Sequence, residues 1–189
     1  MFRSGNTSAL EALGVKGSNL SVALEGDRLV LSGRDGGTVA IPAHAVERLR
    51  HFGTEQVHEL EGSIAATLEA KIWWSGSPRP VVLTAIAGQG GDYRATILDF
   101  AERVAAAHGP GRLQLGPGYA TAIVNLLIVV PPCLLLFALL VGVSILDGGW
   151  WWLATAVIAP LFLWLGGRNL ASRWPRRVRS IEAFRAGLA

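Results

Sequence analysis

The sequence predicts an α+β membrane protein. A small antiparallel β sandwich or open barrel capped by one helix would be followed by a transmembrane helical hairpin and an amphipathic C-terminal helix. Two observations carry this prediction. Of the 189 residues, 51% are hydrophobic and only 16% are charged, which is unusual for a wholly soluble domain. The apolar residues also concentrate in residues 119–167, where Asp147 is the only charged residue.

An N-terminal segment at 1–19 precedes a folded domain at 20–110, in which short strands alternate with tight turns. Aspartate and glycine within turns this short are typical of β-hairpins. Residues 46–52 fit either a half-buried strand or a short helix. The other expected strands are 20–24, 29–32, 38–41, 67–74 and 80–85, joined by turns at 25–27, 34–37 and 75–78.

One amphipathic helix is expected from residue 92 to residue 107. Its apolar side chains recur at helical spacing, and Gly109 followed by Pro110 ends it. The glycine-rich stretch 88–91 that precedes it lacks the lysine of a phosphate-binding loop, so we expect a hinge there. The predicted buried stripe consists of Ile97, Phe100, Ala101, Val104 and Ala107.

Three patterns, at 41–49, 71–85 and 93–100, give the chain a resemblance to a known family. They are Ile41-Pro42 leading into Val46-Glu47-Arg48-Leu49, the hairpin 71–85, and the helix Tyr93-Arg94-Ala95-Thr96-Ile97-Leu98-Asp99-Phe100. Over residues 20–108 the chain resembles the bacterial pleckstrin-homology-like (PH-like) domains of small two-span membrane proteins. The resemblance implies a binding or assembly module rather than a catalyst.

The first hairpin departs from the lipid-binding members of that fold. In those members, basic residues of this loop hold the phosphates of a phosphoinositide. Here the loop reads Glu25-Gly26-Asp27-Arg28 and has a net negative charge. Inositide binding is therefore not expected at this position.

Two membrane spans are predicted at 119–146 and 150–167. About 20 apolar residues suffice to cross the hydrocarbon core, and the first run exceeds that length even though Pro131 and Pro132 interrupt it. The short turn between the runs requires an antiparallel hairpin. Because the arginines follow the second run and the turn has none, the positive-inside rule predicts a bacterial inner-membrane protein with both termini cytoplasmic.

The basic tail is predicted to form an amphipathic helix at 174–188. Residues 168–189 carry six arginines against Glu182, whereas residues 1–118 are balanced at 11 Lys+Arg and 12 Asp+Glu. Such a helix is expected to lie along the inner leaflet, and packing on a partner or on the folded domain is the alternative. The candidate contacts to anionic lipids are Arg168, Arg173, Arg176, Arg177 and Arg179.

No arrangement of residues points to a reaction, a cofactor or a metal. His44, His51 and His58 stand seven residues apart, which does not match the spacing of a metal site, so hydrogen-bonded or solvent-facing histidines are expected. His108 is expected to cap the end of its helix. The single cysteine, Cys133, excludes an internal disulfide.

Three residues are candidates for partner binding. Trp73 and Trp74 are adjacent on a predicted strand, so one should enter the core and the other should be exposed or covered by a partner. Asn125 is the one strongly polar side chain of the first apolar run and would contact another helix. The predicted function is a non-enzymatic accessory or scaffold subunit of a membrane complex or a self-associating protein, without nucleic acid or a small-molecule substrate. The alternatives are an anionic-lipid sensor and a homo-oligomeric pore.

Overall fold

A computed structural model describes residues 1–188 except 54–56, 60–61, 65–67, 87 and 148–173. The chain divides into two compact units, each considered by itself. The first combines Met1–Gly116 with Arg176–Ala189, and the second is Pro117–Pro175.

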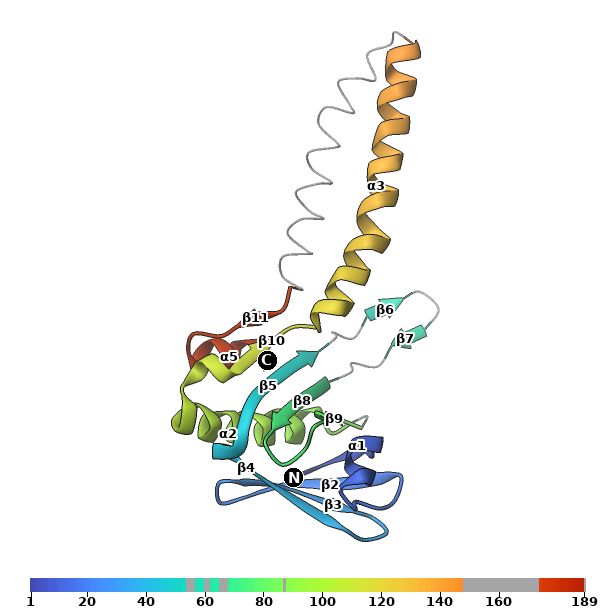
Figure 1. Cartoon of the computed structure of the whole chain (residues 1–189). Helices are drawn as coiled ribbons and strands as arrows, with labels where there is room; N and C mark the ends of the chain where they lie inside the picture. The colour runs from blue at the N-terminus through green and yellow to red at the C-terminus, as the bar shows by residue number, and fades with distance from the viewer. Residues whose placement is uncertain (54–56, 60–61, 65–67, 87, 148–173, 189) are drawn as a thin grey trace. The chain divides into compact units, whose positions relative to one another are not determined.

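A four-stranded antiparallel sheet, here called sheet A, begins the first unit (Figure 1). The expected hairpin is confirmed, with its turn at Gly26, whose φ of +60° favours glycine. The N-terminal segment 1–19, for which the sequence predicts no strand or helix, contains a strand and a short helix, α1 (Ser8–Ala12). The strands, in spatial order, are β1 (Phe2–Gly5), β2 (Asn19–Glu25), β3 (Arg28–Gly33) and β4 (Thr38–Pro42).

A five-stranded sheet, here called sheet B, follows through the short 3-10 turn Ala43–Ala45. Residues 46–53 form a strand, which decides between the two alternatives for this segment, and the second predicted hairpin is confirmed. The spatial order is β11 (Arg176–Arg177), β10 (Leu113–Leu115), β5 (Val46–Gly53), β8 (Leu68–Trp74) and β9 (Val81–Thr84), with β10 parallel to β5. Between β5 and β8, β6 (Val57–Glu59) and β7 (Gly62–Ile64) pair with each other.

The predicted amphipathic helix is α2 (Gly90–His108), which passes behind β5 and β8 in Figure 1. Four of the five residues of the predicted stripe are buried, but Ala107 is exposed and Tyr93 and Thr96 take part instead. A single core joins both sheets to this helix, with Phe2, Leu31, Ile72 and Phe100 among its fully buried members.

The predicted tail helix at 174–188 is wrong in extent. Arg176 and Arg177 pair with β10 as a strand, and α5 begins only at Ile181 and ends at Leu188. Pro175 precedes the strand, and the Ser180 hydroxyl accepts a hydrogen bond from the Ala183 N–H at 3.2 Å, which helps to start α5 late.

The prediction that this tail lies on a membrane surface is also wrong. Val178, Phe184 and Leu188 are buried in the same core as α2 and β10, and Gly187 lies directly against the Leu115 side chain. The amphipathic pattern was real, but the surface it covers belongs to the folded domain, which was the alternative. Burial of large apolar side chains supplies the driving force.

The two predicted membrane spans require a correction. In the second unit, α3 runs from Tyr119 to Asp147 and contains Pro131 and Pro132, while the predicted span at 150–167 lies outside the described residues. Over the part of the chain that is described, no helix is long and apolar enough to cross a membrane. Along α3, side chains are described only in short runs.

The prediction of an inner-membrane protein with two spans and cytoplasmic termini is overturned by that finding, and so is the membrane part of the fold class. What is described is an α+β chain with two main sheets.

Candidate partner-binding surface

The outward face of sheet B is built by the alternation of side chains along β5 and β8. Leu49 on β5 and Ile72 on β8 point into the core. The residues directly before and after each of them along its strand point away from the core. The outward residues of the two strands that gather at one place are Arg48 and Arg50 on β5 and Lys71 and Trp73 on β8. These four residues are called the Trp73 face below.

The register of the strands brings basic residues from distant parts of the chain into one row. Arg50 lies opposite Lys71 on one side and Gln114 on the other, and Gln114 lies opposite Arg177. Arg48 lies opposite Trp73. Since residues 1–118 have no excess of positive charge, this concentration is a product of strand pairing rather than of composition.

Three cations surround the ring of Trp73. The guanidinium carbon of Arg48 lies 4.0 Å from the ring centroid, that of Arg50 lies 5.3 Å away and the Lys71 ammonium 5.6 Å away. Each lies within the distance of about 6 Å at which a cation–π interaction is significant. These contacts hold the ring and the long basic side chains in place.

Arg50 is only partly satisfied in this arrangement. Burial lowers the pKa of its guanidinium, the carboxylate of Glu69 opposes that change, and the charge of Arg48 reinforces it. The Nε of Arg50 is buried and has no hydrogen-bond partner among the described residues. A negative group that comes close to such a desolvated cation, which lacks an acceptor, stabilises its charged form.

The two tryptophans divide roughly as the strand alternation predicts. Trp73 belongs to the outward face, whereas Trp74 packs against the core cluster, although both side chains are half-buried. A β-bulge between Val46 and Arg48 shifts the register beside them, so that Trp74 lies opposite Val46. The ring of Trp74 also covers Gly76, where a Cβ would overlap it.

The remaining candidates do not gather at this site, with one exception. Asn125 lies within α3 and its side chain is not described; Arg168 and Arg173 lie outside the described residues. Arg176, Arg177 and Arg179 are exposed, and only Arg177 shares the row of basic residues on sheet B.

The histidine side chains that the structure describes do not gather at one place. His51 is buried against Tyr93, and His44 is exposed with Nδ1 3.8 Å from Asp27. His108 lies in the last turn of α2, and its Nε2 lies 2.6 Å from the carbonyl oxygen of His44. The side chain of His58 is not described. Within the described part of the chain, no three histidine, cysteine or acidic residues could hold a metal ion together.

Sequence reasoning identified Trp73, but it missed Arg48 and Arg50 as residues of this site. The alternation of Arg48 and Arg50 with Leu49 and His51 was a visible signal for one outward face. Which strand lies beside that face was not visible, because it depends on the pairing of β5 with β8, two segments that are far apart in the sequence. Comparison of the chain with protein-family models, curated proteins and solved structures found no match.

Proposed function

We propose that the β-sheet domain is a non-enzymatic binding module that docks an acidic segment of a partner protein on the Trp73 face. The observation that carries this proposal is the set of three cations within 5.6 Å of one outward tryptophan ring. The resemblance to PH-like domains supports a binding module, and the function belongs to the site rather than to the fold.

The composition of the face favours a protein partner. Tryptophan and arginine are the residue types that most often dominate the energy of protein interfaces. The aromatic ring supplies apolar area, while Arg48, Arg50 and Lys71 supply donors for carboxylates on either side of it. The half-buried state of Trp73 means that much of its ring is already positioned, so little conformational freedom is lost on binding.

An acidic partner is favoured by the charges. Glu69 is the acidic residue whose charge acts on Arg50. Two basic residues, Arg48 and Lys71, also lie next to Arg50, so positive charge is in excess there. A carboxylate placed beside Arg50 would offset the charge of a guanidinium whose buried Nε has no acceptor among the described residues. Long-range attraction between such surfaces raises the association rate and weakens with salt.

The test uses a labelled glutamate-rich peptide containing one leucine, with a glutamine analogue of the same length as the matched ligand. Fluorescence anisotropy with the full chain should show binding of the acidic peptide that weakens as salt rises from 50 to 300 mM, and much weaker binding of the glutamine analogue. Trp73→Ala should weaken binding by about 30-fold, the loss expected at an interface hot spot. Arg48→Gln should weaken it by about tenfold.

Arg79→Gln is the matched control, because Arg79 is an exposed arginine in the turn between β8 and β9 and lies outside the Trp73 face. Its binding should equal that of the unchanged chain. Equal binding of the two peptides would overturn the proposal. So would equal loss of affinity in Arg79→Gln and Arg48→Gln, because the effect would then follow net charge alone.

A further inference from the structure

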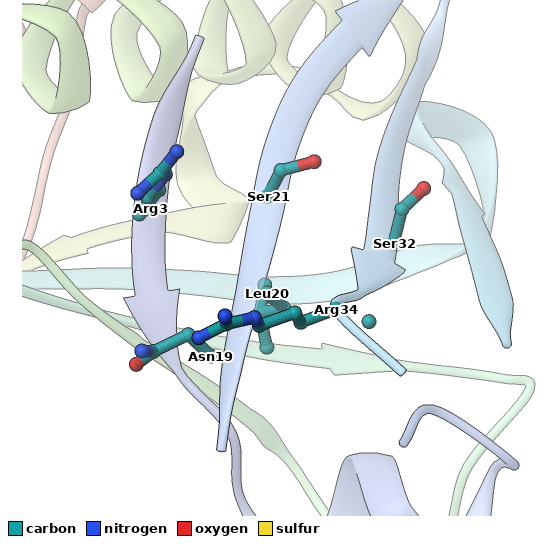
Figure 2. A pocket seen from close by; sticks show the side chains of 7 residues that line it. Arg3, Asn19, Leu20, Ser21, Ser32 and Arg34 are labelled. Carbon is teal, nitrogen blue, oxygen red and sulfur yellow. The ribbon is translucent and has the colours of Figure 1, made fainter. Parts of the chain in front are cut away.

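A second polar site lies on the other sheet, away from the Trp73 face. The outward side of sheet A is hollowed into a groove of about 390 Å³ at the end of β3. Five polar side chains line it together with Leu20 and the backbone of Gly33 (Figure 2). These are Arg3, Asn19, Ser21, Ser32 and Arg34.

Strand pairing accounts for three of these residues. Arg3 lies opposite Ser21, and Ser21 lies opposite Ser32, so that a guanidinium and two hydroxyls cross β1, β2 and β3 in one line. Figure 2 shows these side chains projecting from three adjacent strands. Their strand neighbours Phe2, Val22 and Leu31 are buried on the opposite side, which fixes the face on which the line lies.

The other two residues close one end of the groove. Arg34 follows the last residue of β3, and its backbone N–H donates to the carbonyl oxygen of Asn19 at 3.1 Å. In Figure 2 the side chain of Arg34 extends over β2 toward Asn19. β1 is also held in place, because the N–H of Arg3 donates to Oε1 of Gln89 at 2.5 Å. Both arginines therefore stand on backbone that is fixed by hydrogen bonds.

The lining offers positive charge and hydrogen-bond donors without a carboxylate to neutralise them. Among the residues that the structure describes, no aspartate or glutamate lines the groove. The ion pairs found between described residues join Asp27 to Arg28 and His44, and Glu102 to Arg185, so neither Arg3 nor Arg34 takes part in one. Two guanidinium groups with two hydroxyls and a carboxamide match a group that carries several acceptor oxygens and about two negative charges.

We infer that this groove binds a phosphate monoester. Guanidinium groups present paired donors that fit the oxygens of a phosphate, and Ser21, Ser32 and Asn19 can donate to the oxygens that the arginines do not reach. The volume exceeds that of a phosphate group alone, which leaves room for part of the molecule that carries it. The site is independent of the acidic partner proposed for sheet B.

The direct test is titration of the full chain with glycerol 3-phosphate. Isothermal calorimetry and amide chemical shifts measure the binding. Binding should shift the amides of Ser21 and Ser32, and glycerol at the same concentration should give no shifts. Arg3→Gln and Arg34→Gln should each weaken binding at least tenfold. Arg28→Gln is the matched control, since Arg28 lies at the opposite end of β3 and pairs with Asp27.

A second arm separates the two sources of such a group. Vesicles containing phosphatidate present a phosphate monoester on a lipid, and vesicles of phosphatidylcholine do not. Binding of both phosphatidate vesicles and glycerol 3-phosphate, lost in Arg34→Gln, supports the site with either source. Binding of glycerol 3-phosphate alone restricts the source to a soluble molecule. The inference is overturned if the unchanged chain binds neither, or if Arg28→Gln weakens binding as much as Arg3→Gln.

Discussion

The hydroxyl of Tyr93 lies 2.9 Å from Nδ1 of His51, so that α2 and β5 are joined by a side-chain hydrogen bond inside the core. Burial lowers the pKa of His51 to about 4, the charge of Arg94 lowers it further, and a hydrogen bond with the Glu69 backbone opposes both. Burial also raises the pKa of Tyr93. The tyrosine therefore keeps its proton, and a neutral His51 that donates to the Glu69 backbone can accept a hydrogen bond from the Tyr93 hydroxyl at Nδ1.

Stability should fall as the solution becomes acidic, because of His51. Its pKa is about 6.5 in the unfolded chain and about 4 in the folded one. Between these two pH values the unfolded state therefore binds a proton that the folded state does not bind. Its contribution is fully present above pH 6.5 and is lost as the pH falls toward 4. Between pH 7.5 and 4.5 the free energy of unfolding should drop by about 2.5 kcal/mol from this residue.

Urea unfolding at both pH values measures that change. His51→Gln should remove most of the pH-dependent difference, although it lowers stability at pH 7.5. His44→Gln is the control, because that histidine is exposed, and it should retain the full difference. A pH-dependent difference that persists unchanged in His51→Gln would show that another group is responsible.

Removing one aromatic ring should detach the tail from the domain. Phe184 is fully buried and its ring stands edge-on to His51 at 6.4 Å, so Phe184→Ala should cost about 3–5 kcal/mol of unfolding free energy. Its neighbour Arg185 pairs with Glu102 at 2.8 Å, but both side chains are largely exposed. Arg185→Ala should therefore cost less than about 1 kcal/mol. Similar losses from both variants in denaturant unfolding would contradict the buried position of α5.

Two adjacent glycines should differ in their tolerance of a methyl group. Gly36 and Gly37 both have positive φ angles, +108° and +81°, but a Cβ on Gly36 would meet open space. A Cβ on Gly37 would overlap the carbonyl of Gly14. Gly36→Ala should cost about 1–2 kcal/mol for the backbone conformation alone, and Gly37→Ala should cost clearly more. Thermal unfolding of the two variants measures both losses of stability. Equal losses would contradict the position of the Gly14 carbonyl beside Gly37.

The two tryptophans should contribute unequally to stability. Trp74 packs on the core cluster, so Trp74→Ala should cost about 3 kcal/mol. Trp73 packs on the outward face against basic side chains, and Trp73→Ala should cost about 1 kcal/mol, mainly through lost cation–π contacts. Denaturant unfolding measures both values. A larger loss for Trp73 would assign it to the core and would make it unsuitable as a binding residue.

The parts of the fold that sequence reasoning predicted are those specified locally. The hairpin around Gly26 and the apolar stripe of α2 each depend on residues within one hairpin or one helix. The strands β1, β10 and β11 were missed because they are two to four residues long and are stabilised by pairing with distant segments. Their sequences carry too little periodicity to distinguish a strand from a loop.

The candidate site and the tail show the same limit. The pair Trp73-Trp74 marked a strand with one outward aromatic ring, but its basic neighbours on β5 follow from the pairing of two distant segments, which no local pattern reveals. For residues 174–188, amphipathicity predicted that one face would be covered. It did not specify what covers that face, and α2 with β10 does so.

The pairing of Leu115 with Arg176 joins two parts of the first unit that are separated in the sequence by the second unit, Pro117–Pro175. The core around Phe184 therefore contains side chains from both sides of this insertion. The domain is intolerant of interruption there, because a chain that ended within the insertion would lack β11 and α5 and would leave that core incomplete.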